Sequence, residues 1–169
     1  MEKQLLTNRW ILNASPLIVL ARVKLADLFL QLADEIIIPR AVVNEIHDGP
    51  EGDLARQFLD SGILTIVDAP SPPPALLAWD LGAGETAVIS YVMANAGWVA
   101  ILDDKAARKC ARSFSVSIKG TLGVVLMARQ QNLIPSAANT LRELQKIGFW
   151  FDERLVREAL RQTVNESWI

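Results

Sequence analysis

Carboxylate side chains stand at the borders of several apolar runs in this 169-residue chain. Asp103 and Asp104 directly follow the run WVAIL. Glu45 ends the helix-like stretch AVVNEI, and Glu85 opens another, GAGETAVISYV. Carboxylates that converge from distant parts of a chain repel one another unless a cation neutralises them. Hard divalent ions such as Mg²⁺ and Mn²⁺ prefer oxygen ligands of this kind. The pattern therefore favours a Mg²⁺ or Mn²⁺ site at these four side chains.

The first apolar run, WILNASPLI, carries Asn13 where this pattern leads us to expect another carboxylate. An amide oxygen can coordinate Mg²⁺, but it brings no negative charge and cannot accept a proton from water. Two interpretations follow. Asn13 either contributes a carbonyl ligand to a weakened but active site, or it marks a site that has lost its chemistry.

Each acid also has a purely structural interpretation. Glu45 can be a solvated helix residue, and Glu85 can favour the positive end of its helix. Asp104 can cap a helix and still bind a metal. Asp103 and Asp104 are adjacent and point in different directions, so we expect one to bind the ion and the other to support it.

The overall charge does not indicate an obligate nucleic-acid coat protein. The formal net charge is −2, from 17 basic and 19 acidic residues, whereas such proteins are strongly basic. A local basic patch lies within fifteen residues and consists of Lys105, Arg108, Lys109, Arg112 and Lys119. It is either the solvated face of a helix or a surface for phosphate groups.

Other kinds of site find little support. His47 is the single histidine and lies in the turn HDGP, so we expect a surface histidine rather than a Ser-His-Asp site. Cys110 is the single cysteine, which excludes an internal disulfide and a cysteine zinc cluster, and we expect a buried thiol. No glycine-rich phosphate loop follows the first strand. With no apolar run of membrane length and no secretory pattern, we expect a cytoplasmic protein.

Short β-branched runs alternate with longer helical patterns along the chain. Strands are predicted at residues 10–13, 35–39, 63–67, 98–102 and 115–118. Ser15 and Pro16 read as the N-cap and first turn of the first helix, and APSPPPA (69–75) as a loop. Such alternation predicts a three-layer α/β/α sandwich with a central parallel sheet of about five strands. We expect a single domain over residues 1–169, with 135–169 as C-terminal helices that either pack internally or form a partner surface.

The order of five segments resembles the PIN-domain family, in particular PIN-like proteins regarded as toxins of prokaryotic toxin–antitoxin pairs. The segments are ILNASPLIVLARV, IIIPRAVVNEI, LGAGETAVI, AILDDKAARKCA and IKGTLGVVLMA, which span roughly residues 10–130. The resemblance implies the same α/β/α fold and Mg²⁺- or Mn²⁺-dependent RNA cleavage at an acidic pocket. It also implies a small protein antitoxin and frequently a homodimer.

By position, this resemblance assigns roles to individual residues. The family's acidic ligands match Glu45, Glu85, Asp103 and Asp104, and Asn13 stands where its first aspartate usually stands. Ser15 and Thr121 match polar residues that help to hold the site. Lys105, Arg108 and Lys119 are expected to contact the RNA backbone. Together these roles lead us to expect a metal-dependent ribonuclease. The alternatives are a non-catalytic PIN-like module that binds RNA or a protein, and a flavodoxin-like phosphate-binding protein, which the missing glycine-rich loop disfavours.

Overall fold

Five parallel strands form the centre of the structure, a computed structural model that describes residues 7–169. They are β1 (Arg9–Leu12), β2 (Glu35–Pro39), β3 (Thr65–Val67), β4 (Trp98–Ile101) and β5 (Ile118–Lys119), in the order β3-β2-β1-β4-β5. The N-terminal segment that we examined for a secretory signal lies mostly outside the described residues. The predicted parallel α/β sheet is confirmed.

The chain reverses its direction of progress across the sheet between β1 and β4. It moves from β1 outward to β2 and β3, and then returns to β4 on the other side of β1. In the register of these two strands, Leu12 lies opposite Ile101. Ligands of open α/β sheets bind at the carboxyl ends of the strands at such a reversal. The residues that follow Leu12 and Ile101 therefore occupy the natural position for a site.

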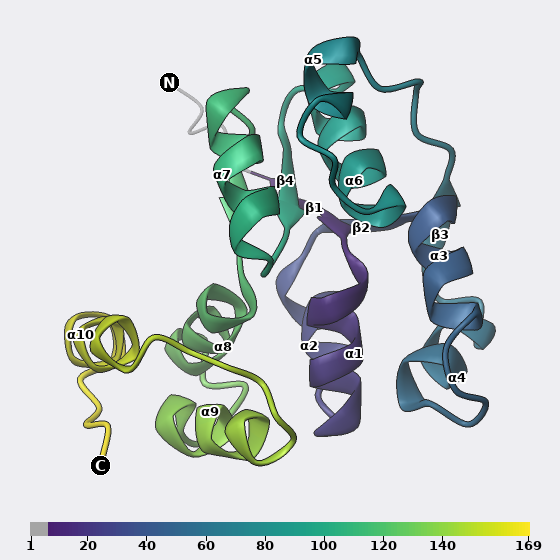
Figure 1. The fold of residues 1–169 in the computed structure, drawn as a ribbon. Helices are drawn as coiled ribbons and strands as arrows, with labels where there is room; N and C mark the ends of the chain where they lie inside the picture. Colours follow the sequence, from purple (N-terminus) through teal and green to yellow (C-terminus); the bar gives the residue numbers. More distant parts are fainter. Residues whose placement is uncertain (1–6) are drawn as a thin grey trace, which may run out of the picture.

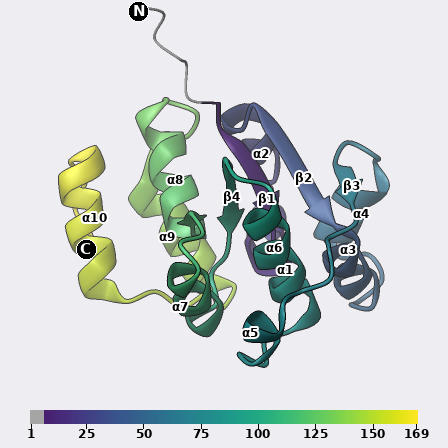
Figure 2. The ribbon, with the colours of Figure 1, turned by 90° about the horizontal axis from the view of Figure 1, so that it is seen from above.

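Helices cover both faces of the sheet (Figure 1). On one side lie α5 (Pro74–Leu77), α6 (Ala83–Ala94) and α7 (Lys105–Ser113), and on the other α1 (Ala14–Arg22) and α2 (Asp27–Leu32). The remaining helices are α3 (Arg40–His47), α4 (Leu54–Asp60), α8 (Thr121–Gln130), α9 (Ala137–Lys146) and α10 (Glu153–Val164). Figure 2 shows α10 at the opposite end of the molecule from α3 and α4.

Burial on both faces explains why the central strands are apolar at consecutive positions. Trp10, Ile11 and Leu12 of β1 are buried, as are Ala100 and Ile101 of β4. A strand of a parallel sheet covered by two helical layers needs apolar side chains on both faces, rather than the alternation of a half-exposed strand. None of the helices within residues 7–169 has the length and apolar character needed to cross a membrane.

The expectation that Ser15 caps the first helix is wrong. Asn13 occupies the N-cap position with extended backbone angles (φ −87°, ψ 169°), and α1 begins at Ala14. Ser15 and Pro16 thus lie within the first turn, where a proline is tolerated because the N–H groups lack intrahelical acceptors. The Asn13 side chain makes no capping hydrogen bond, which leaves it available for another role.

Several other element boundaries differ from the sequence prediction by one or more residues, and two of these differences have a clear local cause. The segment expected as a loop contains the start of α5, because Pro74 at the first helical position has a backbone angle already suited to a helix. The fifth strand covers Ile118–Lys119 rather than 115–118, because Ser115 has a left-handed backbone (φ 57°) that no strand accommodates.

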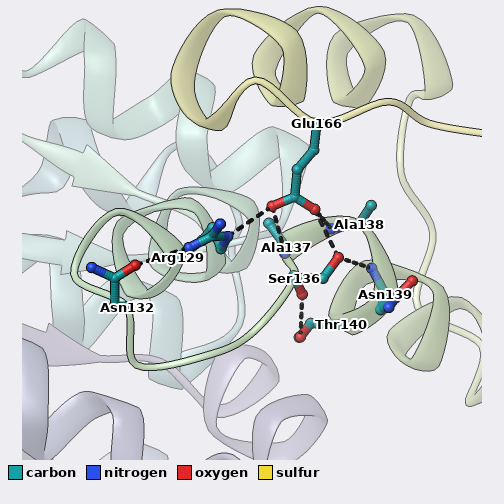
Figure 3. Close-up of polar contacts among 8 residues, drawn as sticks. All are labelled: Arg129, Asn132, Ser136, Ala137, Ala138, Asn139, Thr140 and Glu166. Atoms are coloured by element: carbon teal, nitrogen blue, oxygen red, sulfur yellow. Dashed lines mark hydrogen bonds and ion pairs between the residues drawn. The ribbon is translucent and has the colours of Figure 1, made fainter.

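The C-terminal residues fold back onto α8 and α9 through Glu166 (Figure 3). The Glu166 carboxylate accepts hydrogen bonds from the backbone N–H groups of Ala137 (3.1 Å) and Ala138 (3.0 Å) and from Ser136 Oγ (2.7 Å). Arg129 Nε lies 3.2 Å from it. We call Arg129, Ser136, Ala137, Ala138 and Glu166 the C-terminal clasp. A carboxylate at a helix N-terminus is favoured by the helix dipole and by the unpaired N–H groups.

The environment of Glu166 favours its charged form. Burial raises its pKa, but the hydrogen bonds from Ala138, Ser136 and Ala137, together with the charge of Arg129, outweigh burial and hold the pKa below its usual value. A group whose pKa is lowered by folding stabilises the folded state wherever it is ionised in both states. The clasp therefore contributes fully above about pH 4.3, the ordinary pKa of glutamate, and is lost as the pH falls through the lowered value.

We predict that Glu166→Gln lowers the free energy of unfolding at pH 7 by about 1–2 kcal/mol, because the bonds to the carboxylate lose their charge and one donor faces an amide NH₂. The difference between wild type and variant should shrink as the pH falls below 4. Chemical denaturation at both pH values measures it. Glu143→Gln is the matched control, because Glu143 forms an exposed pair with Lys146, and such pairs contribute little. Equal effects of the two substitutions would contradict the role of the clasp.

Candidate functional site

Asn13 is a buried polar residue at the reversal point of the sheet. The residue is only 4% exposed, and its backbone N–H donates to the carbonyl oxygen of Ile101 (3.2 Å). Within the described residues, Asn13 Oδ1 has no hydrogen-bond partner. Leaving such an acceptor buried and unpaired costs about 1–3 kcal/mol. An unpaired oxygen at the carboxyl ends of β1 and β4 is therefore a candidate ligand atom.

Glu45 reaches from α3 to the first turn of α6. Its Oε1 accepts a hydrogen bond from the backbone N–H of Gly84 (2.8 Å). A Cβ atom at position 84 would lie 2.7 Å from Glu45 Oε2, so only glycine permits this approach. The sequence-based reading overlooked this function of Gly84, although the closely spaced glycines of GAGE were a signal for close backbone contact.

Glu85 lies beside two other carboxylates. Its Oε2 accepts from the backbone N–H of Gly82 (3.2 Å). Burial raises the pKa of Glu85, the charge of Asp104 raises it further, the Gly82 hydrogen bond lowers it, and the charge of Glu45 raises it. Carboxylates from α3, α6 and the end of β4 are thus close enough to repel one another. We call Glu45, Glu85 and Asp104 the acid cluster.

Asp104 combines the helix-capping role with membership of the acid cluster. Its Oδ1 accepts from the backbone N–H of Ala107 (2.8 Å) and caps α7. The capping bond uses one carboxylate oxygen and fixes the side chain at the helix start. Because Asp104 is exposed, its other oxygen can meet a ligand from solvent.

Asp103 is turned toward α8. Its Oδ1 accepts from the backbone N–H of Thr121 (2.7 Å), and its Oδ2 accepts from Thr121 Oγ1 (2.6 Å). Burial raises the pKa of Asp103, while Thr121, the charge of Arg108 and the Ser15 hydroxyl lower it. With both oxygens bound to the fully buried Thr121, Asp103 joins the end of β4 to the start of α8. This geometry fits the supporting role expected of one of the two aspartates.

The basic residues are not equivalent. Lys105 is exposed at the first position of α7, beside Asp104. Arg108 is half-buried and donates from Nη1 to the carbonyl oxygen of Leu102 (2.9 Å). It passes close over Gly120, where a Cβ atom would lie 2.7 Å from Nη1. Burial and the neighbouring Arg112 lower the pKa of Arg108, whereas Asp103 raises it. Arg108 therefore binds the protein's own backbone close to Asp103, whereas Lys105 is exposed to solvent.

The structure confirms two simpler expectations. His47 is a surface residue paired with Asp60, with 3.0 Å between Nε2 and Oδ1. Cys110 is a buried free thiol. Neither residue belongs to the acid cluster, so the chemistry of the site depends on oxygen donors.

The donor atoms fit a hard divalent cation, with less charge than an all-carboxylate site. Within residues 7–169, no three Asp, Glu, His or Cys side chains are arranged as a ready metal site. Glu45, Glu85 and Asp104 each engage one oxygen with a backbone N–H. Each keeps a second oxygen, and Asn13 Oδ1 adds a neutral donor. Three carboxylates and an amide match the oxygen preference of Mg²⁺ and Mn²⁺.

Comparison with known proteins gives one clear match. A family model described as a PIN domain matches residues 9–165, which include every residue of the site described above. No curated protein matches the chain significantly.

We predict that Glu85→Gln stabilises the metal-free protein at pH 7. The folded-state pKa of Glu85 is raised, so its ionisation costs stability at neutral pH, and the cost disappears below about pH 4, where it is protonated in both states. The gain should be less than about 1 kcal/mol because the group is partly exposed. Thermal unfolding in EDTA at the two pH values tests this, with exposed Glu51→Gln as the control. A destabilised variant at pH 7 would show that Glu85 is not in repulsive contact.

Proposed function

Because this chain belongs to the PIN-domain family, we propose that it is a Mg²⁺- or Mn²⁺-dependent endoribonuclease and the toxin of a toxin–antitoxin pair. PIN domains are generally dependent on divalent metals. Two observations support the proposal: the mutual repulsion of Glu45, Glu85 and Asp104, and the buried, unpaired Asn13 Oδ1 that follows β1 at the reversal point of the sheet. The proposal places the protein in the cytoplasm, where its RNA would be found.

The residues would divide the work as follows. Asn13, Glu45, Glu85 and Asp104 would hold the ion, and Asp103, with Thr121 and Ser15, would keep the end of β4 in position. A bound divalent ion polarises the phosphodiester and lowers the pKa of water at the site. Burial and the charge of Asp104 raise the pKa of Glu85, so in the metal-free site Glu85 holds a proton more readily than an ordinary glutamate.

Positive side chains would position the RNA backbone. Lys105 is exposed next to Asp104, and we assign it the first phosphate contact. Lys119 lies along Gly123 and Arg108 lies behind Asp103, so both add positive charge around the site. Phosphate contacts position a strand without reading its sequence.

The C-terminal helices offer a surface for the antitoxin or for a second copy of the chain. Trp150 is 79% exposed and Leu155 is 61% exposed. Large apolar side chains in such a position are typical of partner surfaces.

A second function is favoured by the same Asn13. A PIN-like module that binds RNA or a protein partner with weak or no catalysis would need fewer negative charges. It predicts little stabilisation by Mn²⁺ and no metal-dependent cleavage, so the two functions give different results in the experiments below.

We predict that millimolar Mn²⁺ raises the melting temperature of EDTA-treated wild-type protein. A ligand at a hundredfold excess over its Kd adds about 2.7 kcal/mol of stability. Asp104→Asn should abolish this shift and the cleavage of labelled RNA, while keeping the helix cap, because asparagine caps as well as aspartate. Exposed Asp48→Asn serves as the control. Unchanged cleavage by Asp104→Asn would refute the assignment of the site.

We further predict that Asn13→Asp tightens Mn²⁺ binding by about tenfold or more, because it adds a charge to the cluster, worth at least about 1.4 kcal/mol at short range. The same substitution should destabilise the metal-free protein, since a fourth buried or clustered charge lacks compensation. Mn²⁺ titration by calorimetry and RNA cleavage measure the gain. If Mn²⁺ affinity does not increase, Asn13 does not face the ion.

A further inference from the structure

A groove of about 670 Å³ lies between α3, α6 and the segment 68–72. Binding sites for small molecules typically have volumes of about 300–1,000 Å³. Its lining is mostly apolar, with polar side chains from several elements: Arg40, Asn44, Asp68, Ser71 and Thr86. A mainly apolar floor with a few polar groups suits a ligand that has both a flat ring and hydrogen-bonding edges.

The groove and the acid cluster are built on the same two helices, α3 and α6, although no residue of the acid cluster lines the groove. On α3, Ala41 lines the groove and lies one turn before Glu45, so the two share a helix face. On α6, Ala83 and Thr86 line the groove and belong to the same first turns of the helix as Glu85. The groove also adjoins the ends of β2 and β3, at the same edge of the sheet as Asn13. A strand bound at the acid cluster can thus continue into the groove.

Arg40 supplies the positive charge of the groove. Its Nε pairs with Asp68 Oδ1 at 2.8 Å, and the two side chains are 58% and 77% exposed. Ion pairs in such exposed positions contribute little to stability, so they exchange partners easily. No hydrogen bond from the Arg40 Nη groups is found within residues 7–169. A planar guanidinium with unused donors matches the geometry of a phosphate.

The outer wall of the groove is held in place. Ser90 Oγ on α6 donates to the carbonyl oxygen of Pro70 (3.0 Å), and prolines at 70, 72, 73 and 74 restrict the backbone of this segment. The groove therefore exists before any ligand binds. Asn44, Ser71 and Thr86 offer an amide and two hydroxyls, which can bond to the edges of an unpaired base.

We propose that this groove binds a nucleotide of single-stranded RNA that flanks the cleaved phosphate, with Arg40 exchanging Asp68 for the RNA backbone. The inference rests on the proposed ribonuclease function and adds a subsite to it. The base lies on the apolar floor, and the phosphate faces the rim at Arg40. Asp68 competes with the phosphate for Arg40, so the two residues have opposite effects on RNA binding.

This opposition provides the test. The variants are Arg40→Gln, Asp68→Asn and Ser71→Trp, which places a large ring in the groove from an exposed loop position. Exposed Arg154→Gln on α10, at the far end of the molecule, is the control. KM and kcat are measured with labelled single-stranded RNA and Mn²⁺, and the Kd of the same RNA is measured by fluorescence anisotropy in EDTA.

We expect Arg40→Gln and Ser71→Trp to raise KM and Kd, by about tenfold for the loss of a charged hydrogen bond. Asp68→Asn should lower both by about two- to threefold. The value of kcat should stay unchanged in all three, because the groove is separate from the reacting atoms. A gain of affinity in Asp68→Asn cannot arise from misfolding.

Several results would overturn the proposal. If Arg40→Gln and Asp68→Asn shift KM and Kd in the same direction, the pair is only a structural link between α3 and the 68–72 segment. If Ser71→Trp changes neither constant, the groove does not take RNA. If the wild type cleaves RNA but no variant differs from it, the subsite fails while the ribonuclease stands. If the wild type cleaves nothing, opposite Kd shifts in EDTA sustain the subsite without the ribonuclease, and undetectable RNA binding refutes both.

Discussion

Backbone N–H groups at the starts of three helices hold the four carboxylates of this protein in place. Glu45 and Glu85 bind to the beginning of α6, Asp104 to α7 and Asp103 to α8. The positive ends of these helices thus converge on one region. Without these donors, the carboxylates would turn away from one another into solvent. The positive ends of the helices therefore compensate the negative charge of the carboxylates. The parallel sheet determines where those helix ends lie.

This arrangement explains why the site is both rigid and incomplete. Each member of the acid cluster uses one carboxylate oxygen to accept a bond from a backbone N–H at a helix start. This bond, and not a neighbouring ligand, fixes the direction of the other carboxylate oxygen. Asn13 is held differently, because only its main chain is bonded, to Ile101. Among the buried side-chain nitrogen and oxygen atoms of residues 7–169, its Oδ1 is the one without a hydrogen-bond partner. A donor without charge at this position makes the site depend more strongly on the three carboxylates.

Much of the fold could be predicted from the sequence because its signals are local. The apolar runs of β1 and β4 and the helical spacing after each strand specify alternating elements, and few arrangements bury them all. The position of Asp103 and Asp104 beyond the carboxyl end of β4 followed from the same rule. Ser15 was misassigned because a cap depends on where the strand ends, which local composition leaves uncertain by a residue or two.

The details of the site were beyond the sequence because they depend on contacts between distant segments. The approach of Glu45 to Gly84 requires the packing of α3 against α6, and the inward turn of Arg108 requires the space above Gly120. The two bonds from Thr121 to Asp103 join residues eighteen positions apart. Each of these contacts depends on the distance between two elements to within a few tenths of an ångström, whereas the sequence pattern indicates only which elements form.

The C-terminal clasp also affects how the molecule opens. Glu166 receives the first N–H groups of α9 through its side chain, and its own backbone N–H donates to Leu160 at the end of α10. A single residue thereby satisfies backbone groups at the end of α10 and at the beginning of α9. Without it, the two helix ends would fray independently. Amide hydrogens at these two termini should exchange with solvent as one cooperative unit. Glu166 thus sets the local unfolding energy of a helix that begins 29 positions earlier in the chain.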